Sequence, residues 1–288
     1  MISATTRLYM INQIPNIARN GANMPCVGLG TMLYPEPEKA IDLISHALDY
    51  GYTHIDTARK YGSENWVGEA IKLSNISRDN LWVTTKVTED NAKPVDFRKS
   101  VETSLSALNL DYVDLLLIHW PSRSVSIKDT VCALNDAKEE GLALNIGISN
   151  FTVPLIEEAV RYSKSELFCN QIEYHAYINQ DKVLDACDKY GILVTCHVPL
   201  ARGEILNDPI IKSIAQKHMK SPAQVALKWL LQQSRISVVP RALSYREIEE
   251  NISIFDFDLS EDDMSQISTL RGNNRRIVDP EVRRPVWD

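Results

Sequence analysis

The feature that most constrains the fold is a regular alternation of two kinds of segment along the chain. Short apolar runs rich in β-branched residues alternate with longer segments whose apolar residues recur at helical spacing. The short runs span 26–30, 53–56, 81–87, 112–120, 144–149, 167–174, 192–198 and 236–240. The segments with helical spacing include 37–49, 64–73, 95–108, 128–140 and 153–162. Repeated strand–helix units of this kind predict a parallel sheet covered by helices.

The number of units distinguishes between two parallel-sheet folds. Eight units within 288 residues match a (β/α)₈ TIM barrel, an α/β fold that typically takes about 250 residues. A doubly wound dinucleotide-binding sheet would instead carry GxGxxG after its first strand. The sequence at 28–33 reads GLGTML and has no third glycine. We therefore expect a TIM barrel, and because no Pro/Gly/Ser-rich linker interrupts the chain, a single domain over 1–288.

Other segments lie outside this repeat. Before the first strand, Asn20-Gly21 separates two short apolar runs, which predicts a β-hairpin within 12–25 that plugs the bottom of the barrel. Two extra helices are expected at 221–233 and 260–270. A tail rich in proline and arginine follows at 272–288.

The charge balance and the first residues limit the partners and the location. A net charge of −7 and a pI near 5.5 argue against nucleic acid or an anionic membrane as the main partner. The first residues lack the continuous apolar core of a signal peptide, and no run reaches membrane-spanning length, so we expect a cytoplasmic protein. The cysteines are scattered without a CxxC pair, which argues against structural zinc and against a disulfide framework.

Polar and ionisable residues gather where the predicted strands end. In a TIM barrel these ends form one rim, and the active site lies there. The residues at these positions are Asp56, Lys86, His119, Trp120, Ser149, Asn150, Asn170, Gln171, His197 and Arg241. Taken singly, Asp56 can be a helix cap, Lys86 a snorkelling side chain and His119 a hydrogen-bonded rim histidine. Their concentration at one rim is hard to obtain from packing alone.

The residue types at this rim fit the reduction of a carbonyl group. Tyrosine has a reference pKa of about 10 and is a poor acid unless an adjacent cation stabilises its phenolate. Lys86 can supply that cation to Tyr61, and Asp56 can pair with Lys86 so that a buried ammonium is tolerated. His119 can orient and polarise the carbonyl oxygen. Because the set holds no nucleophile, it predicts proton transfer to an oxyanion as hydride arrives.

Seven segments resemble those of the aldo-keto reductases and occur in the order of that family. They are GLGT (28–31), GYTHIDTARKYGSENWVGEAI (51–71), TTKV (84–87), LNLDYVDLLLIHWP (108–121), GISNF (147–151), NQIEYH (170–175) and VVPRALSYREIEEN (238–251). The resemblance covers nearly the whole chain. It is closest to the bacterial 2,5-diketo-D-gluconate reductase-like branch, since the ending PEVRRPVWD leaves little room for a long substrate-capping loop.

The resemblance implies NAD(P)H-dependent reduction of an aldehyde or ketone, and it implies which residues serve it. The catalytic tetrad is Asp56, Tyr61, Lys86 and His119. The implied cofactor-binding residues are Gly30, Thr31, Met32, Asp56, Ser149, Asn150, Gln171, His197, Pro199, Leu200, Arg202, Glu204, Pro240, Arg241, Ala242, Ser244, Glu247, Glu250 and Asn251. The implied substrate-binding residues are Met32, Tyr61, His119 and Trp120. No metal is implied.

Three positions depart from the family pattern. His197 stands where an aromatic residue usually stacks on the nicotinamide, and Met32 stands where a tryptophan is common. Glu247 stands where NADPH-specific members have an arginine that binds the 2′-phosphate, whereas Arg241 keeps a positive charge nearby. We expect NADPH to be favoured slightly over NADH. Small aldehydes, α-dicarbonyls or keto-sugars are the expected substrates, and a monomer is the expected form.

Two other functions compete with this one. His54 and Asp56 share a strand face, and histidines follow at later strand ends, which partly imitates a metal-dependent barrel hydrolase. The chain lacks a His-x-His on its first strand, and a hydrolase leaves Tyr61 unexplained. A non-catalytic nucleotide-binding protein on the same fold is the second alternative. A protein that only binds a nucleotide would not need Lys86 opposite Tyr61.

Overall fold

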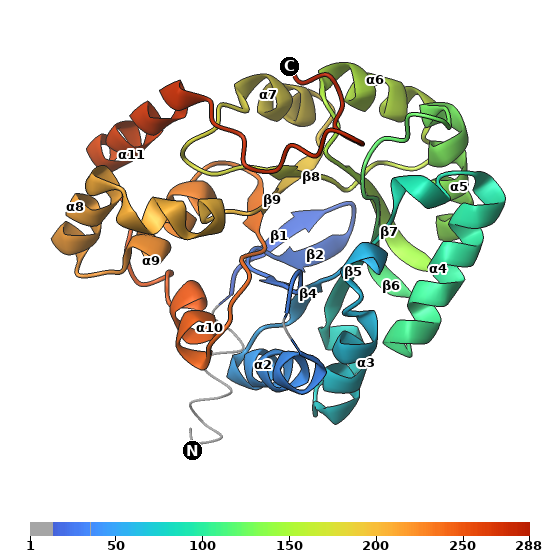
Figure 1. Cartoon of the computed structure of the whole chain (residues 1–288), viewed down its shortest axis with the longest axis horizontal. Coiled ribbons are helices and arrows are strands. Elements are labelled where there is room, and N and C mark those ends of the chain that lie inside the picture. The colour runs from blue at the N-terminus through green and yellow to red at the C-terminus, as the bar shows by residue number, and fades with distance from the viewer. Residues whose placement is uncertain (1–13, 35) are drawn as a thin grey trace.

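The computed structural model describes residues 14–34 and 36–288, and its centre is a parallel sheet curled into a barrel (Figure 1). The strands are β3 (Leu29–Gly30), β4 (His54–Asp56), β5 (Trp82–Val87), β6 (Val113–Ile118), β7 (Ala143–Ser149), β8 (Cys169–Glu173), β9 (Leu193–His197) and β10 (Ile236–Val238). Each lies beside its neighbour in sequence order. The ring closes because Gly28 N–H donates to the carbonyl of Val238 at 2.9 Å and Val238 N–H donates to that of Cys26. The predicted TIM barrel is confirmed.

Helices surround the barrel in the same order (Figure 1). They are α2 (Pro37–Tyr50), α3 (Glu64–Leu73), α4 (Pro94–Leu108), α5 (Ile127–Glu139), α6 (Val153–Tyr162), α7 (Asp181–Lys189), α8 (Pro209–His218), α9 (Pro222–Leu231), α10 (Tyr245–Ile252) and α11 (Glu261–Ser268). The expected extra helices correspond to α9 and α11, and both begin at a capping box, at Ser221 and at Ser260. Across 14–34 and 36–288, none of the helices combines the length and the apolar character needed to cross a membrane.

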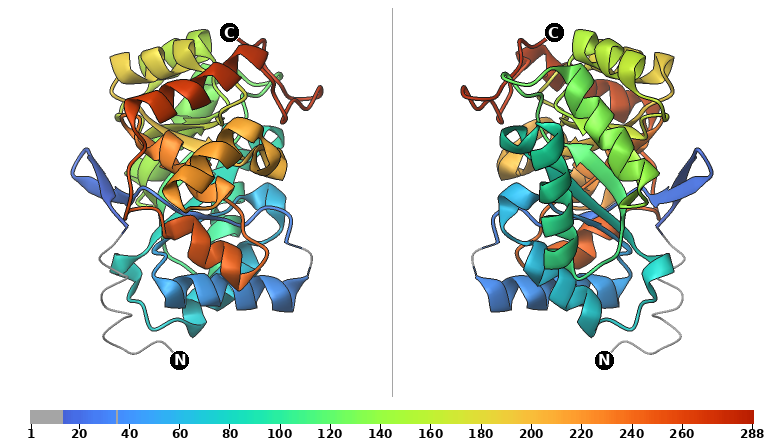
Figure 2. Two further views of the ribbon diagram at one scale, coloured as in Figure 1. Left: turned by 90° about the vertical axis from the view of Figure 1, so that its left-hand side faces the viewer. Right: turned by 90° about the vertical axis from the view of Figure 1, so that its right-hand side faces the viewer.

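A hairpin of β1 (Asn16–Arg19) and β2 (Ala22–Pro25) covers the N-terminal end of the barrel. Its turn residues Asn20 and Gly21 both have positive φ, as a type I′ turn requires. Met24 is fully buried and packs inside the barrel with side chains of β5 and β6. Figure 2 shows the hairpin at the opposite side of the barrel from the C-terminal tail. The predicted plug is confirmed, although residues 12 and 13 of its expected range lie outside the described residues.

Close packing of α3 against the end of α4 leads to a prediction about stability. A Cβ added to Gly68 would lie 2.5 Å from the backbone oxygen of Leu108. Overpacking of this kind costs about 1–3 kcal/mol, which exceeds the gain of at most about 1 kcal/mol in helix propensity. We expect Gly68→Ala to lower the free energy of unfolding by about 1–2 kcal/mol in urea titrations. Gly272→Ala, with no atom within 4 Å of its added Cβ, is the control, and equal losses in both variants would contradict the packing argument.

Candidate active site

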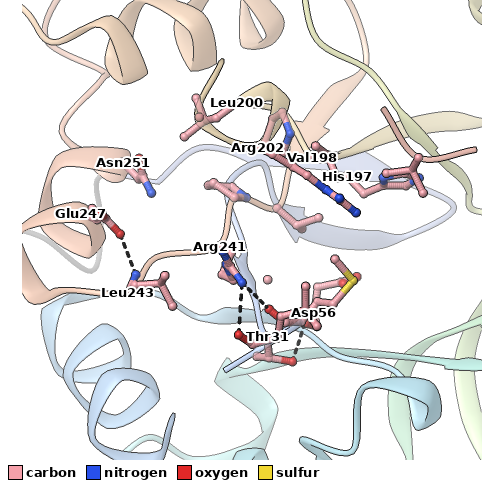
Figure 3. Close-up of a pocket in the computed structure, with 18 of the residues that line it drawn as sticks. Thr31, Asp56, His197, Val198, Leu200, Arg202, Arg241, Leu243, Glu247 and Asn251 are labelled. Atoms are coloured by element: carbon pink, nitrogen blue, oxygen red, sulfur yellow. Dashed lines mark hydrogen bonds between the residues drawn. The ribbon is translucent and has the colours of Figure 1, made fainter. Parts of the chain in front are cut away.

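One pocket of about 1010 Å³ opens at the C-terminal ends of the strands, and Figure 3 shows it in close-up. Most of the residues predicted to bind cofactor or substrate line it: Gly30, Thr31, Met32, Asp56, Tyr61, His119, Trp120, Asn150, Gln171, His197, Pro199, Leu200, Arg202, Pro240, Arg241, Ser244, Glu247, Glu250 and Asn251. The predicted residues outside the lining are Lys86, Ser149, Glu204 and Ala242. The structure therefore brings together residues that are up to about two hundred positions apart in the sequence, as the barrel rim requires.

The ammonium of Lys86, which is buried beneath the lining of this pocket, is the centre of the predicted tetrad. Lys86 Nζ donates to Asp56 Oδ1 at 2.6 Å and to the carbonyl of Thr57 at 2.8 Å. The hydroxyl of Tyr61 lies 3.4 Å from the same nitrogen. Lys86 is 1% exposed and Asp56 is 2% exposed, so the charges of this pair are nearly shielded from solvent. A buried ammonium is tolerated here because a carboxylate and a carbonyl both accept its hydrogen bonds.

A network of hydroxyl groups holds the loop that carries Tyr61. This residue ends a 3₁₀ turn, Arg59–Tyr61, which follows β4. The Ser63 hydroxyl lies 3.0 Å from both the Thr57 and the Thr31 hydroxyls, and Thr31 Oγ1 also bonds the carbonyl of Asp56. These bonds tie the loop to the ends of β3 and β4 and so fix the phenol beside Lys86. The ring of His119 meets the Tyr61 ring edge-on, with centroids 5.6 Å apart.

The protonation of these groups suits a proton donor beside a neutral imidazole. Burial raises the pKa of Tyr61 above its usual value, and the charge of Lys86 only partly offsets that rise. Burial also acts to lower the pKa of Lys86, but the charges of Asp56 and Tyr61 raise it above its ordinary value. Burial and the nearby Lys86 hold the pKa of His119 well below its usual range. At neutral pH the site therefore holds a protonated phenol, an ammonium and an uncharged imidazole.

A second set of hydrogen bonds supports the tetrad from β7, β8 and β9. Gln171 Nε2 donates to the other carboxylate oxygen of Asp56 at 2.7 Å, and Ser149 Oγ donates to the backbone carbonyl of Gln171. Asn150 Nδ2 donates to the carbonyl of His119 at 2.9 Å. His197 Nε2 lies 2.9 Å from Asn150 Oδ1, and burial lowers the His197 pKa to about 4. Ser149, Asn150 and Gln171, which the sequence predicts to bind the cofactor, are thus joined in one network at the inner end of the pocket.

The loop after β9 has backbone strain where it lines the pocket. Val198, Ala201, Arg202 and Gly203 all have positive φ, a conformation that is rare for a β-branched residue such as Val198. Strain of this kind concentrates at ligand-binding segments. Figure 3 shows Arg202 in the pocket wall. Glu204 points elsewhere, since it pairs with Arg275 at 2.7 Å.

The far end of the pocket is formed by the segment after β10. Glu247 accepts a hydrogen bond from Leu243 N–H at 2.6 Å, as the dashed line in Figure 3 marks, and so has a fixed position. Arg241 donates to the carbonyl of Leu33 at 3.1 Å, across to the loop after β3. Arg246 is mostly exposed and pairs with Glu250 at 3.7 Å. Cations and carboxylates are therefore mixed at this end, and Arg241 already has partners.

The sequence analysis missed pocket residues from the C-terminal tail. Val278 and Arg283 both line the pocket, as does Lys60 beside Tyr61. The tail is held there by the carboxylate of Glu173, which accepts the N–H groups of Ile277 and Val278 at 2.6 and 2.7 Å. The sequence signal that could have indicated these tail residues is the high arginine content of 272–288. The tail is too short for a long substrate-capping loop, as expected, yet it still contributes Val278 and Arg283 to the pocket.

His54, one of the residues that partly imitate a metal site in the sequence, makes hydrogen bonds in the core. His54 Nδ1 lies 3.2 Å from the carbonyl of Pro25, and Nε2 lies 3.3 Å from Thr84 Oγ1. Burial lowers the pKa of His54 to about 4. The part of the chain that the structure describes contains no group of three or more His, Cys, Asp or Glu placed to hold a metal ion.

Comparisons with known proteins agree with this geometry. The aldo/keto reductase family matches residues 26–271. The methylglyoxal reductase DkgB of Escherichia coli O157:H7 is 40% identical over 268 residues, which are 92% of this chain and 99% of that protein. A solved structure assigned as a 2,5-diketo-D-gluconic acid reductase B has a TM-score of 0.92 at 40% identity, covering 97% of this chain and 99% of its own. The Bombyx mori aldo-keto reductase AKR2E4, solved in complex with NADP, has a TM-score of 0.86 at 30% identity, covering 93% and 95%. The chain belongs to the aldo/keto reductase family.

Proposed function

We propose that this protein uses NAD(P)H to reduce the carbonyl group of a small aldehyde, α-dicarbonyl or keto-sugar, with Tyr61 as the proton donor. The observation that carries the proposal is the Lys86 ammonium held between the Asp56 carboxylate and the Tyr61 hydroxyl, at 2.6 and 3.4 Å. A non-catalytic nucleotide-binding protein would not need a phenol beside a buried, paired ammonium. That arrangement supports reduction over simple binding.

The residues of the pocket fit a dinucleotide cofactor, which supplies the hydride when bound. Backbone strain at 198–203 and the cations Arg202 and Arg246 suit the phosphates of such a cofactor. Gln171 and Asn150 line the inner part of the pocket, where amide groups can hold a carboxamide. We propose that these residues orient the reacting face towards Tyr61. Lys86, Asp56 and His119 are buried, so bulk water is largely excluded from the inner end of the pocket.

The proton step is assigned to the chain's own groups. Tyr61 holds its proton at neutral pH because burial raises its pKa. When charge develops on the carbonyl oxygen, Tyr61 donates its proton to that oxygen, and Lys86 stabilises the phenolate that remains. His119 is neutral, so it can donate one hydrogen bond to the oxygen without competing as a stronger acid. Asp56 keeps Lys86 in place.

The likeness to a methylglyoxal reductase and the pocket walls support small substrates. Trp120 is buried and meets Trp287 of the tail edge-on, with centroids 6.1 Å apart. Trp287 in turn bonds Asp279 and lies under the Arg276 guanidinium at 3.5 Å. Because these contacts hold Trp287 against Trp120, the wall that Trp120 forms has little freedom to move aside for a bulky substituent.

For the cofactor, we propose that both forms are used, with NADPH slightly favoured and Glu247 limiting the preference. Glu247→Arg should tighten NADPH binding about ten- to hundredfold, because it replaces a carboxylate with a charge-assisted donor to the 2′-phosphate. NADH binding should change by no more than a few-fold. Both dissociation constants can be measured by quenching of tryptophan fluorescence.

The control for this variant is Glu249→Arg, which makes the same charge change at a residue that bonds His46 and does not line the pocket. It should leave the ratio of the two dissociation constants nearly unchanged. A wild-type protein that already prefers NADPH a thousandfold, or a Glu247→Arg variant without gain, would show that another residue binds the phosphate.

The proposed function is tested by a screen of carbonyl compounds with NADPH and with NADH, followed by cofactor absorbance. Methylglyoxal, small aldehydes and keto-sugars should oxidise at least one cofactor, and purified protein stripped of metals by chelation should keep this activity. Tight cofactor binding without turnover of any carbonyl would favour the non-catalytic alternative. Cofactor oxidation that disappears on chelation and returns with metal would contradict reduction by the chain's own groups alone.

A further inference from the structure

A buried carboxylate lies behind the loop of the proton donor and takes no part in the reduction chemistry. Glu64 is the first residue of α3 and is 2% exposed. Its Oε1 accepts a hydrogen bond from Thr85 Oγ1 at 2.7 Å, and its Oε2 accepts one from Arg59 Nη1 at 3.3 Å. Glu64 does not line the pocket, so it does not touch substrate or cofactor there. Its two partners, however, lie next to the reacting groups.

Each partner of Glu64 belongs to an element that carries a tetrad residue. Arg59 begins the 3₁₀ turn that ends at Tyr61. Thr85 directly precedes Lys86 in β5. Neighbouring residues of a strand point to opposite faces, so Thr85 faces the surrounding helices while Lys86 faces the barrel interior. Glu64 therefore joins, from outside the barrel, the turn that carries the phenol to the strand that carries the ammonium.

The other supports of this loop hold its start or lead to other strands. Thr57 N–H donates to the carbonyl of Thr84 at 2.9 Å, which ties the start of the loop to β5. The hydroxyl network described above leads back to the ends of β3 and β4. Lys60, inside the turn, pairs with Asp90 at 3.7 Å, but both side chains are largely exposed, so this pair adds little. The Glu64 carboxylate is therefore a buried side-chain link from the turn itself to β5.

Packing alone does not account for a carboxylate at this position. Moving the Glu64 carboxylate out of water offsets much of its attraction to Arg59, so apolar side chains could hold α3 against β5 equally well. A carboxylate differs from an apolar side chain because its hydrogen bonds fix distances and directions. What Glu64 adds is thus a defined position of the turn relative to β5.

We propose that Glu64 is a positioning residue that keeps the Tyr61 hydroxyl within reach of the Lys86 ammonium. The inference rests on the proposed carbonyl reduction, in which that ammonium stabilises the phenolate. The hydroxyl lies 3.4 Å from Lys86 Nζ, near the upper limit of a hydrogen bond, so a small outward movement of the turn breaks this contact. Glu64 itself makes and breaks no bond during the reaction.

The pKa of Tyr61 gives a test whose sign distinguishes position from charge. The charged groups that influence it most are Lys86, Asp56 and Arg283. If Glu64 acted through its charge, Glu64→Ala would lower this pKa, because the phenolate would lose a like charge. Loss of positioning should instead raise it, because the phenolate would lose its contact with the ammonium. In Glu64→Ala we therefore expect a Tyr61 pKa above that of the wild type and below that of Lys86→Met.

Fluorine-19 NMR measures this pKa without any turnover. The tyrosines are replaced by 3,5-difluorotyrosine, a more acidic phenol that titrates nearer to neutral pH, and the Tyr61 signal is assigned by its absence in Tyr61→Phe. The conservative variant Glu64→Gln removes the charge but keeps an amide that can bond both Arg59 and Thr85. Its Tyr61 pKa should stay at or slightly below that of the wild type.

Asp114→Ala is the matched control for Glu64→Ala. Asp114 is also buried, accepts the Val83 N–H of β5 at 2.8 Å and pairs with Arg78 at 2.7 Å, but near the opposite end of the strand from Lys86. Glu64→Ala should lower kcat about ten- to hundredfold with KM within about twofold, as a small misplacement of a reacting group predicts. Asp114→Ala should lose stability but keep the pKa of the phenol, and keep kcat within about threefold, because distant sites act independently.

A double variant shows whether Glu64 acts through Tyr61. In a Tyr61→Phe background, Glu64→Ala should change the residual turnover by less than about twofold, because the positioned hydroxyl is already gone. Thr85→Val removes one bond of the Glu64 carboxylate with little change of size, and it should raise the Tyr61 pKa by a smaller amount even if Glu64→Ala is poorly folded. A Tyr61 pKa that falls or stays unchanged in the folded variants, or effects that add fully in the double variant, would overturn the proposal.

The NMR titration and the kinetics together separate this proposal from the proposed function. If the Tyr61 pKa rises in Glu64→Ala and the wild type reduces no carbonyl compound, the reduction is wrong and the positioning by Glu64 holds. If the wild type reduces carbonyl compounds and Glu64→Ala leaves both the Tyr61 pKa and kcat unchanged, the reduction holds and the role of Glu64 is wrong.

Discussion

Tyr61→Phe should lower turnover about 10²- to 10⁴-fold, the range expected when a general acid is removed. The phenyl ring keeps the edge-on contact with His119 and the packing of the pocket, so only the hydroxyl group that donates the proton is lost. The dissociation constant of NADPH should change by no more than about twofold, because the hydroxyl faces Lys86 at the pocket floor. Steady-state kinetics with methylglyoxal and a fluorescence titration of NADPH measure the two quantities.

Tyr52→Phe is the matched control for this variant. The Tyr52 hydroxyl bonds the carbonyl of Ile248 at 2.9 Å in the core and does not line the pocket, so its loss should affect stability more than turnover. A Tyr61→Phe enzyme with most of the wild-type turnover would rule out Tyr61 as the proton donor.

Lys86→Met should lower turnover nearly as much as Tyr61→Phe does, but for a different reason. Burial already raises the pKa of Tyr61, and Lys86 is the largest influence that lowers it, so removal of the ammonium should raise that pKa further and make the phenol a weaker acid. It also leaves Asp56 buried without its partner, which costs stability as well as activity. The alkaline limb of the pH profile for reduction should therefore move to higher pH in the residual activity.

Lys86→Arg distinguishes charge from geometry. The guanidinium keeps the positive charge, so Lys86→Arg should retain more activity than Lys86→Met without reaching that of the wild type. Thermal unfolding of both variants shows whether loss of activity merely follows loss of structure. An alkaline limb that stays in place in Lys86→Met would mean that Lys86 does not control the proton of Tyr61.

The barrel could be predicted because its signal repeats along the chain. Each strand run is too apolar to face solvent, and eight of them in sequence order leave few arrangements besides a closed parallel ring. Helix α8 was not among the helices predicted from the sequence, although its start carries a clear signal: Asp208 caps it and Pro209 is its first residue.

The pairing of Lys86 with Asp56 and Tyr61 could be predicted because Asp56 and Lys86 lie at the ends of neighbouring strands and Tyr61 lies in the short loop after the first of them. The tail could not be placed in this way. Its course depends on long-range contacts, chiefly the Glu173 carboxylate that accepts N–H groups of Ile277 and Val278. A buried glutamate at the end of β8 gives no sequence signal of which backbone groups it binds. The position of Arg283 in the pocket therefore required the structure.

The account is tested most directly by following the hydride and the proton together. Wild-type protein with methylglyoxal and NADPH deuterated at the hydride-donating carbon should give an alcohol with one deuterium on the former carbonyl carbon, as detected by mass spectrometry. Tyr61→Phe, with cofactor bound equally well, should form this product at least about a hundredfold more slowly. An alcohol without deuterium, or equal rates of labelled product in both proteins, would contradict reduction by hydride transfer with Tyr61 as the proton donor.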